Sequence, residues 1–381
     1  MKFFKKEENK TVKEKSSQRL APAWIGIYIF AAFSLCIYIT AIFWEDFANF
    51  FTRYPSAFVR GLLSYLTYLL PISFAELMLI LLIPAAVIVI IIACKRYCDT
   101  WKSVFLFGGK LLAVVSLMFS LFVWTLGPGY RTTKLEDRLG FADVKIEKES
   151  LGETAEILIE IINGAAKKVE FGEDGFSPMP YSLDEMSKKL MVAYNEICDE
   201  YDFIPRLYSR VKPVMLSEPM TYTHIAGVYS YFTGEANINV VFPDYTLPFT
   251  AAHELAHQRG ISREDEANFI AFMVCSRSDD PYIRYSGCIG VLDYVLDAYY
   301  SADKSEGHAD YKALYASLDE NVKKEQRAYY EFYKKYADNI AATVSGAVNN
   351  SYLQSQGTAG TVSYGLVADL TVRYYATVGR D

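Results

Sequence analysis

The sequence predicts a mainly helical α+β protein whose N-terminal third is embedded in a membrane. Three observations lead to this class. Three long, nearly uncharged apolar runs lie in the first third of the 381-residue chain. Most of the remaining sequence has apolar residues at helical spacing, and one stretch near the middle has the β-branched and aromatic residues typical of short strands. We therefore expect a tail over residues 1–20, a membrane domain over 21–127 and a further domain over 128–381.

The apolar runs predict three transmembrane helices, at about residues 21–44, 74–94 and 104–126. Each run is long enough to cross a hydrocarbon core of ~30 Å as a helix. The intervening segment 58–70 is also apolar, but it is short and carries Arg60, so an interfacial or re-entrant helix is expected there instead of a fourth span. The lipid bilayer is thus the first expected partner.

Charges beside these runs predict the orientation of the chain. Lys and Arg are frequent in the tail, and Lys95, Arg96 and Lys102 follow the second run. Positively charged flanks stay in the cytoplasm, so we expect a cytoplasmic N-terminus and an extracytoplasmic domain over 128–381. The net charge of −7 and the lack of a basic stripe outside the membrane flanks give no reason to expect a nucleic-acid partner.

The C-terminal domain is expected to consist mostly of helices around one small sheet. Residues 214–242 predict two or three short strands, because Tyr, Val, Ile and Thr are broken by turn residues at Gly227 and Gly234. The expected helices of this domain are 151–168, 182–201, 290–300, 311–339, 342–353 and 366–375.

Three cysteines lie in the same domain. An oxidising compartment would allow one disulfide among Cys198, Cys275 and Cys288. Cys275 continues an apolar helical run, so we expect it to be a buried thiol. The sequence leaves the pairing open.

The segment His253-Glu254-Leu255-Ala256-His257 is an HExxH motif. Residues four apart lie on one face of a helix, so both imidazoles are able to bind one metal ion, while Glu254 is placed to handle a water on that metal. The pattern favours zinc as a cofactor. The rival interpretation is a structural helix with two solvent-facing histidines.

A catalytic zinc site needs a third protein ligand. Gly260 is suited to ending the motif helix and Ser262 to beginning the next one, which brings the first turn of the second helix beside His257. Glu264 and Glu266 lie in that turn, and both are candidates for the ligand.

The residues just before the motif alternate between polar and apolar, as a strand would. Glu235, Ala236, Asn237 and Asn239 belong to this strand. An edge strand beside a metal-binding helix holds an extended substrate by strand addition, which makes these residues candidate substrate contacts. An ordinary surface strand explains the pattern equally well, and the sequence leaves both interpretations open.

The segment Glu264-Asp265-Glu266-Ala267-Asn268 resembles the third-ligand helix of two zinc-peptidase groups, the membrane-embedded CAAX-processing type and the repressor-cleaving type. The resemblance implies that Glu264 binds the metal, which makes Glu264 the first choice for the ligand and Glu266 the alternative. It also implies that Asn268, one turn later, orients a ligand by hydrogen bonding. Only six residues separate His257 from Glu264, which is closer than is usual in those groups.

Nearly the whole chain also resembles an uncharacterised bacterial family of membrane-anchored HExxH proteins, a domain of unknown function that is similar to gluzincin-type zinc metallopeptidases. The resemblance is carried by the segments TGEANINV, LPFTAAHELAHQRGISREDEANFIA, RYSG and VNNSYLQSQG. It implies a zincin-like extracytoplasmic domain, with its sheet beside the HExxH helix, behind three helices in the bacterial cytoplasmic membrane. It implies no particular substrate.

The expected function is that of a membrane-anchored zinc metallopeptidase acting on peptides or proteins outside the cytoplasmic membrane. Zinc would lower the pKa of its water, Glu254 would accept the proton and pass it to the leaving amine, and a donor would stabilise the oxyanion. Tyr285, which we include in the catalytic set, Arg284, Tyr229 and His224 are the candidate donors. The alternative is a non-catalytic zinc-binding membrane sensor or scaffold, which has no need of Glu254.

Overall fold

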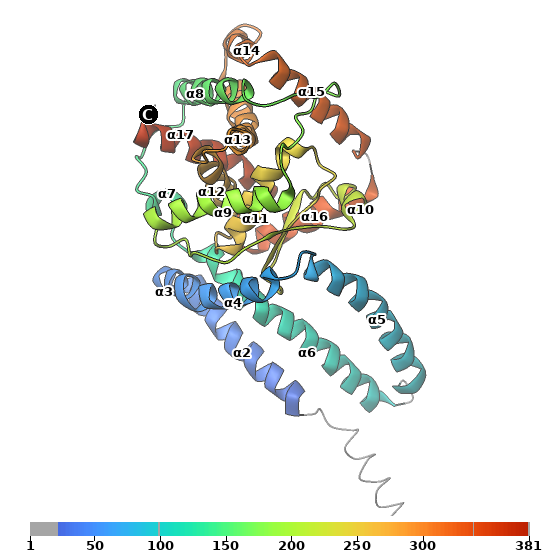
Figure 1. The fold of residues 1–381 in the computed structure, drawn as a ribbon. Helices are drawn as coiled ribbons and strands as arrows, with labels where there is room; N and C mark the ends of the chain where they lie inside the picture. The colour runs from blue at the N-terminus through green and yellow to red at the C-terminus, as the bar shows by residue number, and fades with distance from the viewer. Residues whose placement is uncertain (1–21, 98–99, 338, 380–381) are drawn as a thin grey trace, which may run out of the picture.

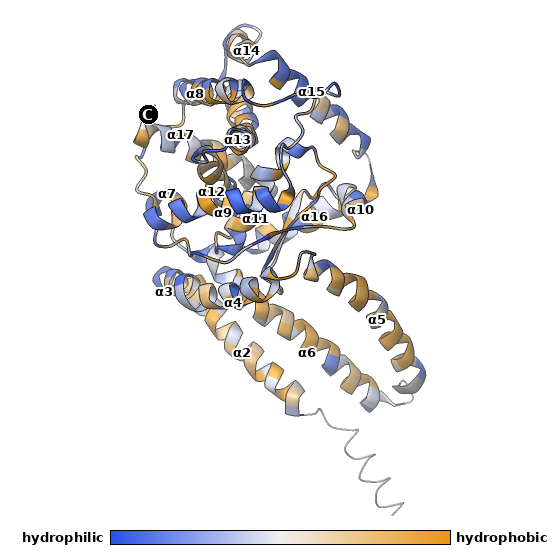
Figure 2. Ribbon diagram, viewed as in Figure 1, coloured by the Kyte–Doolittle hydropathy of each residue, from blue (hydrophilic) through white to orange (hydrophobic). Residues whose placement is uncertain are grey.

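A computed structural model describes residues 22–97, 100–337 and 339–379. Within these residues, three helices are long and apolar enough to cross a membrane: α2 (Pro22–Phe43), α5 (Phe74–Tyr97) and α6 (Trp101–Thr125). They extend from one side of a globular domain, residues 127–379, and are apolar over most of their length (Figures 1 and 2). The prediction of three spans is confirmed at this level, and the predicted basic tail over 1–20 lies outside the described residues.

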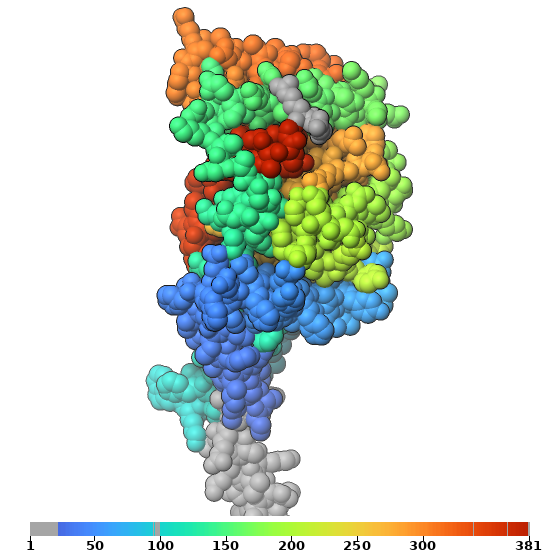
Figure 3. All heavy atoms as spheres, turned by 90° about the vertical axis from the view of Figure 1, so that its left-hand side faces the viewer, coloured from blue at the N-terminus to red at the C-terminus, as the bar shows by residue number. Residues whose placement is uncertain are grey.

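A bent helical segment lies between these membrane helices and the globular domain. It consists of α3 (Glu45–Phe51), the π-helix η1 (Thr52–Ser56) and α4 (Ala57–Tyr68). The space-filling view shows it in blue as a layer above the membrane helices (Figure 3). None of these helices qualifies as a span among the described residues, which agrees with the expectation for 58–70.

The globular domain is mainly helical, and its core is built around one central helix, α12 (Glu264–Ser276). Every residue of α12 from Glu266 to Cys275 is buried, as expected of a helix packed on all sides. The other helices of the domain are η2 (Gly127–Arg131), α7 (Leu135–Arg138), α8 (Lys148–Ala166), α9 (Leu183–Glu200), α10 (Ser217–Thr221), η3 (Asp244–Thr246), α11 (Leu247–Gln258), α13 (Pro281–Ala302), α14 (Ala309–Ala316), α15 (Glu320–Lys335), α16 (Ile340–Ser355), η4 (Gly360–Leu366) and α17 (Val367–Val378).

The prediction of a single helix over 311–339 is wrong. Helix α14 ends at Ala316, and the Asp319 side chain caps the next helix, α15, by accepting a hydrogen bond from the Asn321 backbone.

The sequence left open a disulfide among the three cysteines of this domain. The thiols of Cys198, Cys275 and Cys288 are all free, and Cys275 is buried as expected.

A small three-stranded sheet lies beside α11. Its strands are β1 (Val211–Pro213), β2 (Gly227–Ser230) and β3 (Glu235–Ile238), in the order β1-β3-β2. β3 pairs in parallel with β1 and antiparallel with β2. β3 is therefore the central strand, and in the described part of the chain no strand pairs with the outer edge of β2.

The expectation that residues 235–239 form a substrate-binding edge strand is consequently wrong. Ala236 and Asn237 are paired on both sides, and Glu235 pairs with Ser230 of β2, so β3 is not an edge strand that could accept a further strand. The Asn239 side chain donates to the Thr221 hydroxyl at 2.9 Å. The Glu235 carboxylate instead accepts the first backbone N–H groups of α5, from Phe74 at 3.0 Å and Ala75 at 2.8 Å, and so caps that helix.

Candidate metal centre

The candidate metal-binding residues lie on a hairpin of two helices, α11 and α12. The chain reverses at Gly260, whose φ of +95° is a backbone conformation that favours glycine. The backbone N–H of Ile261 reaches back to the Ala256 carbonyl at 3.1 Å and closes the end of α11. Since α12 begins at Glu264, its first turn is returned to the side of His257.

Three side chains converge at this hairpin. The Glu264 Oε2 lies 3.2 Å from the His253 Nε2 and 3.5 Å from the His257 Nε2. One ligand atom from each of the three residues falls within 4.8 Å of the other two. The side chains are only 11%, 10% and 12% exposed for His253, His257 and Glu264. Two imidazoles and one carboxylate are a ligand set that catalytic zinc sites use, with the fourth position left to water.

The carboxylate and the imidazoles of this cluster each favour the charged form of the other. Burial opposes ionisation of Glu264, but the two imidazoles outweigh it and hold the pKa of the carboxyl well below its usual range. Burial likewise disfavours a charged His257, but the Glu264 carboxylate raises the pKa of that imidazole to about 9. The residues thus form a buried ion pair, in which a cation would take the place of the imidazole proton.

The two histidines are held differently. The Nδ1 of His257 lies 2.7 Å from the Ile261 carbonyl oxygen, which orients the ring so that Nε2 faces Glu264. The Nδ1 of His253 is buried and has no hydrogen-bond partner among the described residues, and the same is true of the Asn268 Nδ2. The predicted role of Asn268 in orienting a ligand stays a prediction.

Glu254 lies between α11 and the edge strand β2. It is 5% exposed, and its carboxylate accepts a hydrogen bond from the Tyr229 backbone. A Cβ atom at Gly227 would come within 2.5 Å of the Glu254 Oε1, so only glycine leaves room for this side chain. Burial is the main cause that raises the pKa of Glu254. The sequence offered Gly227 as a turn residue and gave no sign of this contact.

Glu266, the alternative third ligand, faces away from the histidines. Its Oε1 accepts the Leu135 backbone N–H at 3.0 Å and lies 3.6 Å from the Arg263 guanidinium. Burial raises the pKa of this carboxyl to about 7. The structure therefore brings Glu264 to the histidine pair and does not bring Glu266 there.

Tyr285 is bound to another acid and does not point to the histidine pair, so the prediction that it is a catalytic residue is wrong. The side chain is fully buried, and its hydroxyl donates to the Glu325 carboxylate on α15. Arg284 donates to the Ser278 carbonyl at 2.8 Å, and the His224 Nε2 lies 2.6 Å from the Tyr336 carbonyl. Of the four candidate donors only Tyr229 lies beside the motif, through its backbone.

Two tyrosines near the centre were missed. Burial and the charge of Glu264 raise the pKa of Tyr352 on α16. Burial, with the charges of Asp293 and Glu264, raises the pKa of Tyr294 on α13. Tyr352 also contacts a residue beside the membrane-side helices, because its hydroxyl lies 3.2 Å from that of Tyr130, which follows the end of α6. With 30 tyrosines in the chain, no sequence signal distinguishes these two.

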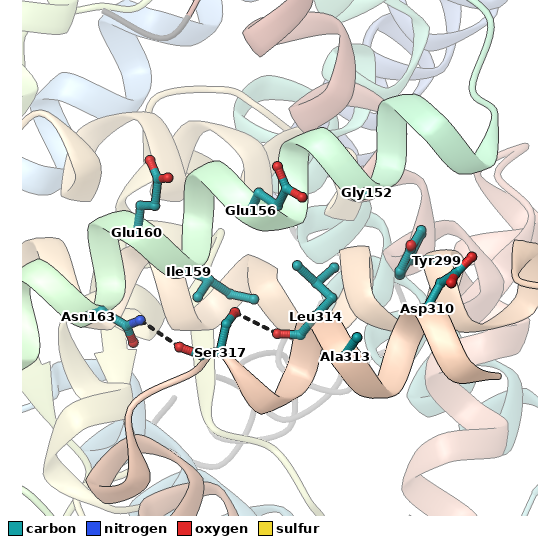
Figure 4. Close-up of a pocket in the computed structure, with 10 residues that line it drawn as sticks. All are labelled: Gly152, Glu156, Ile159, Glu160, Asn163, Tyr299, Asp310, Ala313, Leu314 and Ser317. Atoms are coloured by element: carbon teal, nitrogen blue, oxygen red, sulfur yellow. Dashed lines mark hydrogen bonds between the residues drawn. The ribbon is translucent and has the colours of Figure 1, made fainter.

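One surface hollow lies apart from the candidate metal centre. It has a volume of about 530 Å³ and lies between α8 and α14 (Figure 4). None of the three converging residues lines it. Its lining residues are Gly152, Glu156, Ile159, Glu160, Asn163, Tyr299, Asp310, Ala313, Leu314 and Ser317.

Comparison with known proteins places this architecture in a family. The model of the family described as "Protein of unknown function (DUF3810)" matches residues 51–372, which extend from the last residue of α3 into α17 and include the whole α11–α12 hairpin. Comparisons with curated proteins and with solved structures found no match. The chain therefore belongs to the DUF3810 family of proteins of unknown function.

Proposed function

We propose that the chain is a membrane-anchored, zinc-dependent metallopeptidase with a zincin-like domain, acting on peptide or protein substrates outside the cytoplasmic membrane. The observation that carries this proposal is the convergence of His253, His257 and Glu264 beside a buried Glu254 that faces an unpaired strand edge. A purely structural site closes with four protein ligands and needs no carboxylate at the position of Glu254.

The residues present fit a zinc ion. His253, His257 and Glu264 would hold it, and bound zinc would supply a Lewis acid and bring the pKa of a water towards neutrality. Glu254 would take a proton from the attacking water while the water oxygen forms a bond to the peptide carbonyl carbon. As the C–N bond breaks, Glu254 would return the proton to the leaving amine. A burial-raised pKa suits a group that holds a proton between these two steps.

The substrate would bind along β2, and not along β3 as the sequence predicted. β2 is the sheet edge next to α11, and the Tyr229 backbone N–H that bonds Glu254 lies on it. An extended peptide added to this edge would place one of its carbonyls beside the histidines. Tyr352 and Tyr294 are hydroxyls whose pKa the charge of Glu264 helps to raise, and they replace Tyr285 as our candidate oxyanion donors.

The test uses the full-length chain in lipid nanodiscs, loaded with zinc and incubated with a mixture of fluorogenic peptides. Wild-type protein should cleave some of them, and E254Q should retain zinc but lose at least about a hundredfold in rate. Equal rates for both proteins would exclude Glu254 as the base. Zinc binding without cleavage by wild-type protein would favour the alternative, a zinc-binding sensor or scaffold.

The orientation in the membrane is part of the proposal and has its own test. Val192 on α9 is 62% exposed, so V192C offers an accessible thiol in the globular domain. A membrane-impermeant maleimide should label V192C in intact cells. Labelling that requires broken cells would place the domain in the cytoplasm.

A further inference from the structure

The metal-binding hairpin rests directly on the end of a membrane helix. The Ser262 hydroxyl, in the turn between α11 and α12, donates to the Leu126 carbonyl at 2.8 Å. Leu126 is the residue that follows α6. Ser262 is two residues from Glu264, and two residues span at most about 7 Å. The backbone of the candidate metal ligand is therefore held within roughly 10 Å of the end of a candidate membrane span.

A buried arginine fixes this arrangement. The Arg60 guanidinium of α4 is 1% exposed and donates to the carbonyls of Thr125 at 2.9 Å, Thr52 at 3.0 Å and Arg259 at 3.4 Å. These carbonyls belong to the end of α6, to η1 and to the residue that ends α11. Hydrogen bonds from a buried charge are among the stronger ones in proteins. The centre is thus attached rigidly to the membrane helices and is not carried on a flexible stalk.

The free strand edge also leads towards the membrane helices. The turn that follows β2 sits on α4, where a Cβ atom at Gly234 would meet the Leu63 Cβ at 2.6 Å. In the same turn, Tyr231 packs edge-on against Phe122 of α6, with ring centroids 5.8 Å apart. At its other end, β2 begins at Gly227 beside Glu254. A peptide paired along β2 would therefore run between the candidate catalytic centre and the ends of the membrane helices.

Apolar side chains are exposed along this side of the globular domain. Met215 and Leu216 are 56% and 49% exposed, and their backbone N–H groups bond the Glu76 carboxylate at the start of α5. Val228, on β2 itself, is 45% exposed. Exposed apolar surface next to a site indicates a partner or a lipid surface. Here it continues the apolar surface of the membrane helices.

We propose that the substrates are polypeptides anchored in the same membrane, cut in an extended segment that lies close to the bilayer. The inference rests on the proposed peptidase function. A centre for freely diffusing peptides needs no such position, whereas a tethered substrate would meet this centre at an effective concentration in the millimolar range. The occupant of the β2 edge is then a juxtamembrane strand of a membrane-anchored protein.

The test compares one peptide in two forms, with the full-length zinc-loaded chain in vesicles of phosphatidylethanolamine and phosphatidylglycerol. A fluorogenic peptide cleaved in the nanodisc mixture is prepared with and without an N-terminal or C-terminal palmitoyl anchor, and with Gly-Ser spacers of increasing length. The anchored form with a short spacer should be cleaved at least about tenfold faster than the free form at equal bulk concentration. The rate should fall as the spacer grows, and excess detergent should abolish the advantage.

The outcomes separate this inference from the proposed function. Equal rates for anchored and free peptide, or rates independent of spacer length, would overturn the inference and leave the peptidase intact. If zinc-loaded protein cleaves no peptide, either free in the nanodisc mixture or anchored in vesicles, both the inference and the proposed function are overturned. E254Q serves as the control for each peptide, because cleavage that continues at the wild-type rate in E254Q comes from another protein.

Discussion

The Glu264 Oε2 lies 3.2 Å from the Nε2 of His253, eleven positions earlier on the neighbouring helix. This contact exists because Gly260 reverses the chain between α11 and α12. It brings a carboxylate to a pair of histidines that already share one helix face, and the three side chains form the candidate metal site.

Glu264 and Glu266 form a matched pair for identifying the ligand. Both are buried acids in the first turn of α12, but only Glu264 reaches the histidines. E264Q should weaken zinc affinity by more than the 10–100-fold typical of a residue that acts through another ligand. E266Q should leave affinity nearly unchanged. Competition with a fluorescent chelator measures both, and a reversed order would contradict the ligand set.

Zinc affinity should depend strongly on pH. The Glu264 carboxylate overcomes the effect of burial and raises the pKa of His257 to about 9 in the metal-free protein. Zinc binds the neutral imidazole, so below that pKa each ion displaces a proton and affinity should fall about tenfold per pH unit. The same chelator titration between about pH 6 and pH 9 checks this. In E264Q, zinc affinity should stop rising with pH at the upper end of this range, because His257 has lost the carboxylate that raises its pKa. A zinc affinity of wild-type protein that does not change with pH would contradict the interaction between His257 and Glu264.

Gly227 should be needed for the position of the base. A methyl group there would approach the Glu254 Oε1 to 2.5 Å, so G227A should displace the carboxylate. A misplacement of about 1 Å costs on the order of a hundredfold in rate, while zinc content should stay at the wild-type level. G164A is the control, because a Cβ at Gly164 meets nothing within 4 Å. Equal activity of G227A and G164A would argue against Glu254 as the base.

The attachment of the centre to the membrane helices should depend on Arg60. R60M leaves the carbonyls of Thr125, Thr52 and Arg259 without their charged donor, and should lower stability by about 2–4 kcal/mol. R53A is the comparison, since Arg53 makes an exposed ion pair with Asp202 that should contribute less than about 1 kcal/mol. Thermal unfolding in nanodiscs distinguishes the two, and similar melting temperatures would refute the anchoring role.

Local patterns predicted much of the site. The HExxH spacing places two histidines on one helix face, and Gly260 marks where that helix ends. These two features place the first turn of the next helix beside His257, and the resemblance of residues 264–268 to a third-ligand helix favoured Glu264 over Glu266. The three apolar runs were equally direct, because length and lack of charge are what a bilayer requires.

Long-range pairing could not be predicted in this way. The order β1-β3-β2 depends on Val211–Pro213, a strand of three residues with no pattern to detect. Without it, residues 235–239 resemble an edge strand. Tyr285 was likewise predicted to be catalytic, but its hydroxyl donates to Glu325, 40 positions along the chain. Such contacts are decided by tertiary packing, which periodicity does not contain.

The central claim is that the α11–α12 hairpin holds a metal with one position open to water, and X-ray absorption spectroscopy of the zinc-loaded full-length protein tests it most directly. The account predicts one zinc ion per chain, with two imidazole nitrogens and lighter oxygen donors from Glu264 and water. H253A should lose this signal. A shell closed by four protein ligands, a shell containing sulfur, or no bound zinc at all would contradict the account.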